Sequence, residues 1–154
     1  MNQSEVLRDE AWGCGARIID WDFGDTQIKG LYCDGVIAVS NRLETKAEEA
    51  VILAEELGHH LTAGGVILDQ SRVLNRKQEM RGRAWSYNRL IGLYGIIRAY
   101  RHGCRNRYEL AEFLEVPEQF VSEAVDYYRE KYGLCTVVDN YTIYFDPLGV
   151  MERI

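Results

Sequence analysis

The sequence has little of what usually marks disordered, membrane or secreted proteins. It contains only 2 prolines in 154 residues and is 47% hydrophobic, so a long disordered segment is not expected. No apolar run approaches the roughly 20 residues that a membrane-spanning helix needs. The N-terminal stretch, residues 1–15, carries acids early and has no apolar core, so it does not resemble a secretory signal. We therefore expect a packed cytoplasmic protein with no membrane partner.

Cysteine is also sparse, and its spacing excludes several kinds of site. The four cysteines are far apart in the sequence: Cys14, Cys33, Cys104 and Cys135. Without a C-x-x-C pair, the usual cysteine zinc sites and thioredoxin-type redox sites are excluded. We expect free thiols instead of a disulfide framework.

Basic residues are scarce except in one central block. Residues 76–107 hold 9 basic and 1 acidic side chains, whereas residues 1–75 hold 6 and 13, and residues 108–154 hold 3 and 10. Such a block suits a nucleic acid or an acidic protein partner. Alternatively, its cations pair with the acidic flanks across the fold.

The pattern of apolar residues predicts an α+β protein with more helix than an average globular domain. A small N-terminal sheet, a central helix pair and a helical C-terminal part with a short terminal hairpin are expected. The expected elements are a short helix in residues 1–12, three strands in 16–40, a helix over 44–61, a loop over 62–71, helices over 76–90 and 92–103, two helices in 108–133 with a break before Pro117, and a hairpin in 134–146. We expect residues 1–90 to form the core and residues 91–154 to pack on it as one unit.

The stretch ILAEELGHHLT, residues 52–62, lies on the predicted helix over 44–61 and is one substitution away from a zinc motif. In His-Glu-x-x-His, two histidines on one helix face bind zinc and the glutamate activates water. Here Glu55 stands first, followed by Glu56 and, four residues after Glu55, by His59. Residues four apart share a helix face, so Glu55 and His59 can hold one ion, while Glu56 lies about a hundred degrees round the helix. Zinc accepts carboxylate oxygen as well as imidazole nitrogen.

A catalytic zinc usually has three protein ligands, so a third must come from elsewhere. The next predicted helix offers Glu79, the only acid in the basic block. On spacing alone, an ion pair with Arg76, Lys77 or Arg83 explains Glu79 better than metal binding does.

Two further alternatives stay open at the level of the residues. Glu56 and His60 are also four apart, so they form a second possible ligand pair, which would use up the candidate base. The helix face can also be an ordinary solvated one with one histidine packed on the core. Gly58, between the two pairs, lets another chain segment or a substrate approach the helix closely.

Three segments together resemble the ImmA/IrrE family of metallopeptidases, found on mobile elements, in prophages and on bacterial chromosomes. The run IKGLYCDGVIAVSNRLETKAEEAVILAEELGHHLT is similar to the family's strand followed by a His-Glu-Leu-Gly-His helix. NRKQEMRGRAWSYNRLI is similar to the second helix, in which a glutamate, here Glu79, precedes an aromatic-small pair, here Trp85 and Ser86. The C-terminal segments ELAEFLEVPEQFVSEAVDYYREKYG and YTIYFDPLGV also look like those of family members from Gram-positive bacteria.

The resemblance implies a zincin-like hydrolase that holds one Zn²⁺. It makes Glu56 the base and makes His59 and Glu79 metal ligands, with Glu55 in place of the first motif histidine. It implies cleavage of a helix-turn-helix repressor, which releases the genes of a mobile element or prophage. The alternative is a catalytically degenerate antirepressor that binds the repressor without cutting it.

A regulator of a different class is suggested by residues 109–126, ELAEFLEVPEQFVSEAVD, which read as a helix-turn-helix. A DNA-reading helix needs cations, because neutralising phosphates supplies most of the affinity. This segment instead carries acids at Glu115, Glu118, Glu123 and Asp126, which argue against DNA binding.

Overall fold

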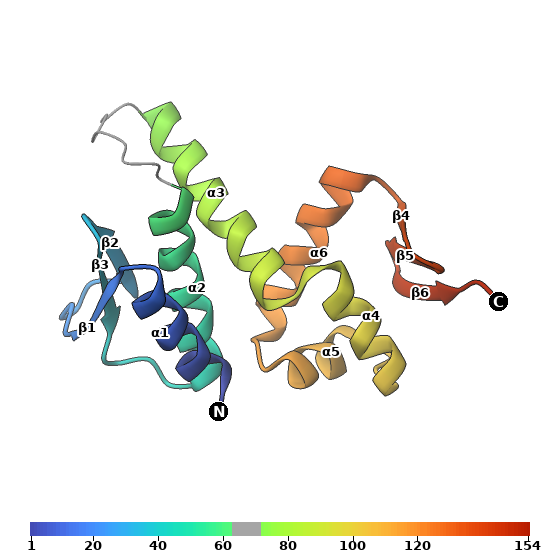
Figure 1. Cartoon of the computed structure of the whole chain (residues 1–154), viewed down its shortest axis with the longest axis horizontal. Helices are drawn as coiled ribbons and strands as arrows, with labels where there is room; N and C mark the ends of the chain where they lie inside the picture. Colours follow the sequence, from blue (N-terminus) through green and yellow to red (C-terminus); the bar gives the residue numbers. More distant parts are fainter. Residues whose placement is uncertain (63–71) are drawn as a thin grey trace. The chain divides into compact units, whose positions relative to one another are not determined.

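The computed structural model describes residues 1–62 and 72–154, with side chains at 1–62 and 76–154, and confirms the α+β class (Figure 1). The described chain is 55% helical, above the base rate for globular proteins. It divides into two compact units, Met1–Ser86 and Tyr87–Ile154, here called the N-terminal and C-terminal units. The division expected from the sequence was after residue 90, and the expected packing of the two parts stays a prediction.

A three-stranded sheet and two long helices organise the N-terminal unit. Its elements are α1 (Gln3–Gly13), β1 (Arg17–Trp21), β2 (Gly30–Cys33), β3 (Val36–Ser40), α2 (Lys46–Thr62) and the first part of α3 (Arg72–Leu90). The strand order is β1-β3-β2, with β1 parallel and β2 antiparallel to β3. The three expected strands and the expected helices are therefore confirmed, while the expected loop over 62–71 lies almost wholly outside the described residues.

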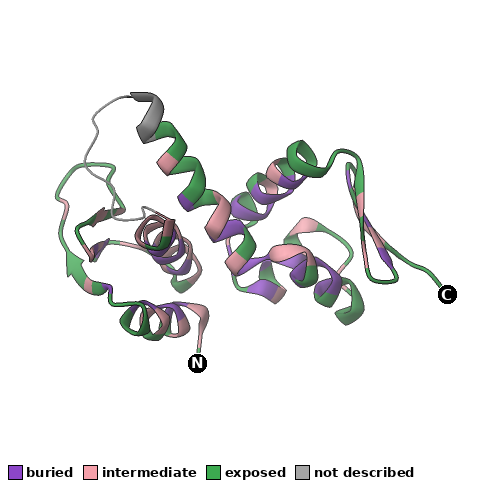
Figure 2. Ribbon diagram, turned by 45° about the horizontal axis from the view of Figure 1, so that its top comes forward, coloured by how far each residue is buried: buried purple, intermediate pink, exposed green. Residues whose placement is uncertain are grey.

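The core of this unit lies between the sheet and its helices. On the central strand β3, Ile37 and Val39 are fully buried. On α2 the buried residues recur at three- and four-residue steps: Ala50, Leu53, Ala54, Leu57 and Gly58 (Figure 2). Contacts of α2 with β2, β3 and α1 follow from this stripe. The apolar stripe thus fixes which face of α2 carries the glutamates and histidines.

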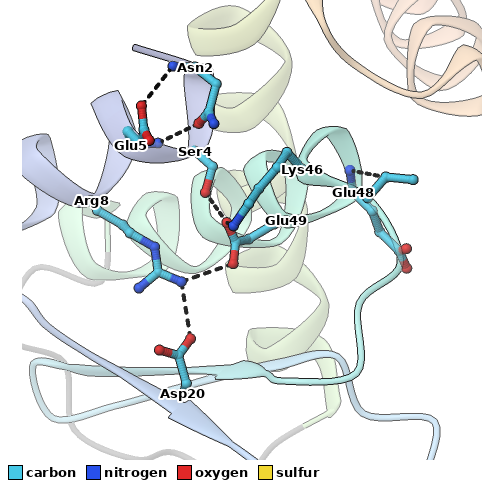
Figure 3. Close-up of polar contacts among 9 residues, drawn as sticks. Asn2, Ser4, Glu5, Arg8, Asp20, Lys46, Glu48 and Glu49 are labelled. Carbon is cyan, nitrogen blue, oxygen red and sulfur yellow. Dashed lines mark hydrogen bonds and ion pairs between the residues drawn. The ribbon is translucent and has the colours of Figure 1, made fainter.

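Glu49 links α2 to α1 through hydrogen bonds (Figure 3). Its carboxylate accepts hydrogen bonds from the Ser4 hydroxyl and from Arg8 Nη2, the latter at 2.9 Å, and from Lys46 Nζ at 3.3 Å. Arg8 also reaches Asp20 of β1 at 3.0 Å. Burial by itself would raise the pKa of Glu49, but the hydrogen bonds from Ser4, Arg8 and Lys46 outweigh it and lower that pKa.

We predict that acid weakens the N-terminal unit through Glu49. Because the pKa of Glu49 is lower in the folded state, its contribution is complete above the unfolded pKa of about 4.5 and is lost as the pH falls through the folded value. At pH 7, Glu49→Gln should cost about 2 kcal/mol, as expected for charge-assisted hydrogen bonds. Urea unfolding followed by tryptophan fluorescence measures this unit alone, since all three tryptophans (Trp12, Trp21 and Trp85) lie in it. The difference between wild type and variant should shrink below pH 4.5, and a pH-independent difference would contradict the assignment.

Three helices and a second small sheet make up the C-terminal unit. Its elements, after the last turn of α3, are α4 (Gly92–His102), α5 (Arg107–Leu114), α6 (Glu118–Tyr132), β4 (Cys135–Val138), β5 (Tyr141–Phe145) and β6 (Leu148–Glu152). The sheet order is β4-β5-β6, antiparallel throughout. The predicted hairpin was therefore incomplete, because the chain turns at Pro147 and adds a third strand. That strand, LGVME, includes a glycine and lacks a clear alternation of apolar and polar residues, so its pattern was weak.

No helix within residues 1–62 and 72–154 is long and apolar enough to cross a membrane.

Candidate metal centre

The candidate site lies where α2 passes α3 within the N-terminal unit. The two helices meet at two glycines: a Cβ built on Gly58 would lie 2.7 Å from the carbonyl oxygen of Gly82. This approach is possible only because Gly58 has no side chain. The expectation that Gly58 admits another chain segment is met by the backbone of α3.

This crossing brings together two of the expected ligands. His59 Nε2 lies 3.7 Å from Glu79 Oε1, although the residues are 20 positions apart in the sequence. The His59 side chain is 15% exposed and that of Glu79 is 63% exposed, so the imidazole is fixed by packing while the carboxylate reaches in from the surface. Glu79 therefore has a contact on the facing helix that its spacing in the sequence did not show.

The surroundings of His59 favour the neutral imidazole, which is the form that can bind a metal ion. Burial lowers the pKa of its imidazole, and Arg83 acts in the same direction. Glu79 and a hydrogen bond to the backbone of Gln78 act in the opposite direction but are outweighed. Metal-binding histidines commonly make such a second hydrogen bond to a carbonyl, which fixes the orientation of the ring.

Glu56 is half-buried on the side of α2 that contacts β2, and the charge of Glu79 acts on its carboxylate. A Cβ on Gly30 of β2 would lie 3.1 Å from Glu56 Cγ and 3.3 Å from its Oε1, so the missing side chain leaves room for the carboxylate. Burial, together with the negative charges of Glu55 and Glu79, raises the pKa of Glu56 to about 7. A carboxyl group with this pKa can both accept and release a proton near neutrality.

His60 has a different environment from His59. Its Nε2 lies 2.8 Å from the carbonyl oxygen of Cys14, and its Nδ1 lies 2.8 Å from the hydroxyl of Tyr32, which also accepts from the Gly35 amide at 3.1 Å. A carbonyl can only accept, so Nε2 carries the proton and Nδ1 accepts from Tyr32. Both ring nitrogens are thus used to link α2 with α1 and with the β2–β3 turn, which favours His59 over His60 as a ligand.

The residue types at the site, an imidazole and carboxylates, are ones that zinc accepts as ligands. Glu55 is half-buried on α2 and is close enough to Glu56 to affect its pKa. Within the described part of the chain, no three side chains of His, Cys, Asp or Glu are gathered closely enough to hold a metal ion. The structure thus pairs His59 with Glu79 and does not complete the expected triad with Glu55.

Two residues next to the site were not anticipated from the sequence. Gly30 is the first residue of β2 and Gly82 lies inside α3, and an isolated glycine in either kind of element often marks a close approach. That signal was present in the sequence, but it does not say which segment approaches.

No family model and no curated protein matches the chain. Among solved structures, a Mycobacterium tuberculosis transcriptional regulator is similar to it, with a TM-score of 0.53 and 15% sequence identity over 80% of this chain. The match spans 40% of that protein's length. At this identity the similarity concerns the fold alone.

Proposed function

We propose that this protein is a cytoplasmic zinc-dependent endopeptidase that cuts a helix-turn-helix repressor at a specific bond. The observation that carries the proposal is the 3.7 Å approach of His59 and Glu79 across the Gly58–Gly82 crossing, with the half-buried Glu56 near enough to Glu79 to feel its charge. The resemblance of these segments to the ImmA/IrrE family supports the same activity and supplies the class of substrate. Cleavage would release the genes of a mobile element or prophage, and activity on generic substrates should be low.

Zinc would be held by Glu55, His59 and Glu79. When bound, it would polarise the scissile carbonyl and make the attacking water more acidic. The long, exposed side chain of Glu79 can change rotamer without disturbing the core, whereas His59 is already fixed. Glu56 is left as the base: its carboxylate takes a proton from the attacking water and later passes it to the leaving amine.

A depression beside the first turn of α2 offers room for a polypeptide in the same unit. It has a volume of about 460 Å³ and includes Phe23, Ile28, Lys29, Leu43 and Glu48 in its lining. Lys29 in its lining is followed directly by Gly30, which contacts α2 at Glu56. Its mixture of apolar and charged side chains suits recognition of a particular sequence.

The proposal is tested by metal analysis and co-expression. Protein purified without chelator should contain about one zinc, and a co-expressed repressor encoded beside this gene should be cut at one bond. Metal that stays far below one equivalent after zinc is added would contradict the site. An intact repressor held in a stable complex would instead support the antirepressor.

The two histidines should differ in their effect on metal binding. His59→Ala should abolish zinc binding, because it removes the imidazole that lies 3.7 Å from the Glu79 carboxylate, and it should also lower stability because that side chain is mostly buried. His60→Ala should leave zinc binding nearly unchanged but cost about 1–3 kcal/mol, because it leaves the Tyr32 hydroxyl and the Cys14 carbonyl without their partner. Zinc competition with a chromophoric chelator and urea unfolding by tryptophan fluorescence measure the two effects. The reverse pattern would move the site to Glu56 and His60.

Nucleic-acid binding through the C-terminal unit is the second candidate. Arg98 and Arg101 of α4 and Arg105 just after it are exposed, and within residues 1–62 and 72–154 none of them forms an ion pair with a carboxylate. The expected pairing of the basic block with its acidic flanks is therefore not seen for these arginines. The acids Glu118, Glu123 and Asp126 are exposed along α6, however, where a helix-turn-helix would meet DNA, so we rank this function below the peptidase.

A gel-shift assay tests whether the chain binds nucleic acid. Specific retardation of DNA by the chain alone, lost in an Arg98→Ala, Arg101→Ala, Arg105→Ala triple variant, would favour the regulator. Absence of binding even at low salt would exclude it, because electrostatic binding is strongest there.

A further inference from the structure

The imidazole of His59 packs against Gly82 in the space that a side chain would fill at any other residue type. A Cβ added to Gly82 would lie 2.6 Å from His59 Cε1, 2.8 Å from Nδ1 and 2.9 Å from Nε2. Distances this short are not tolerated between non-bonded atoms, so any residue other than glycine at position 82 displaces the ring. The orientation of His59 toward Glu79 therefore depends on a missing side chain in the opposite helix.

Neither backbone conformation nor helix propensity calls for glycine at this position. Gly82 is in the interior of α3 and is not among the residues with positive φ, so its backbone suits any L-residue. Alanine would be the better helix former at such a position. The requirement for glycine comes from the His59 ring, which supplies the three heavy atoms nearest to an added Cβ.

The backbone of α3 around Gly82 also provides the other contacts of the ring. Glu79, one turn earlier, lies 3.7 Å from Nε2, and the backbone of Gln78 makes a hydrogen bond with His59. One turn of α3 thus contacts the imidazole in three ways: by packing at Gly82, by the hydrogen bond with the Gln78 backbone and by the Glu79 carboxylate. Only the packing at Gly82 can be changed without altering a polar group.

We propose that Gly82 is the positioning residue for His59: its lack of a side chain holds the imidazole in the orientation that binds metal together with Glu79. The inference rests on the proposed metal site. Because the ring is the far end of a flexible side chain, a methyl group at position 82 should push the ring aside and leave the helices in place. Gly82→Ala should therefore weaken metal binding without unfolding the protein.

Gly82→Ala is compared with Gly95→Ala as the matched control. Gly95 is also a buried helical glycine, but a Cβ there would meet only ordinary contacts, the nearest at 3.7 Å. Zinc affinity measured by chelator competition should fall roughly 10- to 100-fold in Gly82→Ala, the size of effect known for residues that orient ligands, and stay unchanged in Gly95→Ala. The visible spectrum of the cobalt-substituted protein should change only in Gly82→Ala. In metal-free protein, the NMR signals of the His59 ring should shift only in that variant.

A double-mutant cycle keeps the proposal testable if Gly82→Ala lowers stability. With His59→Ala, the ring is absent, so adding Gly82→Ala should raise the unfolding midpoint of the N-terminal unit, as expected for an ordinary Gly→Ala change in a helix. With His59 present, the same change should raise the midpoint less or lower it. Equal shifts in both backgrounds would overturn the contact as the cause.

The outcomes separate this inference from the proposed function. If wild type binds zinc and Gly82→Ala binds it equally well with unchanged His59 signals, the positioning role is overturned and the metal site stands. If wild type binds neither zinc nor cobalt, the metal site fails, and with it the positioning of His59 for metal, whatever the cycle shows about the contact.

Discussion

Glu56→Gln should abolish cleavage of the repressor while zinc and the repressor still bind. Glutamine has nearly the shape of glutamate and fits the space left by Gly30, but it cannot take a proton from water. Loss of a general base typically costs about 10²- to 10⁴-fold in rate. Single-turnover cleavage of purified repressor, measured beside zinc content and co-purification of the repressor, tests all three parts.

Asp9→Asn provides the matched control, because it removes a carboxylate of the same unit at an exposed position of α1. It should cleave at the wild-type rate. If Glu56→Gln cleaves as fast as this control, Glu56 is not the base. If Glu56→Gln loses its zinc, Glu56 is a ligand, and the register with His60 has to be reconsidered.

Gly58→Ala should destabilise the N-terminal unit by about 1–3 kcal/mol, the usual cost of overpacking. Its Cβ would lie 2.7 Å from the Gly82 carbonyl oxygen and 3.1 Å from Trp85 Cβ. The first of these is a backbone atom, so α2 and α3 have to move apart. Separation of the helices would also part His59 from Glu79, and zinc affinity should fall with stability.

The direction of the change in stability separates this prediction from the usual effect of a Gly→Ala substitution in a helix. In a helix interior, Gly→Ala normally stabilises by up to about 1 kcal/mol, and Gly95→Ala should do so. Urea unfolding followed by tryptophan fluorescence reports on Gly58→Ala, and circular dichroism reports on Gly95→Ala in the other unit. If Gly58→Ala stabilises its unit as Gly95→Ala does, the close crossing of α2 and α3 is wrong.

The sequence by itself determined the helices and most of the strands. The apolar residues of α2 recur at helical steps, so its extent, its buried face and the side-by-side placement of Glu55 and His59 follow from local periodicity. The same reasoning located β1, β2 and β3 from short apolar runs between turn residues. It missed β6, whose pairing with β5 depends on a partner strand more than on its own residues.

Only the tertiary structure distinguished the two adjacent histidines. Their local sequence is shared, but His60 meets Tyr32 and the carbonyl of Cys14, whereas His59 meets Glu79 and Gly82. These partners lie between 20 and 46 residues away in the sequence, so no local pattern includes them. An amphipathic pattern states which side of a helix is buried, but which segment approaches that side is decided when the helices and the sheet pack together.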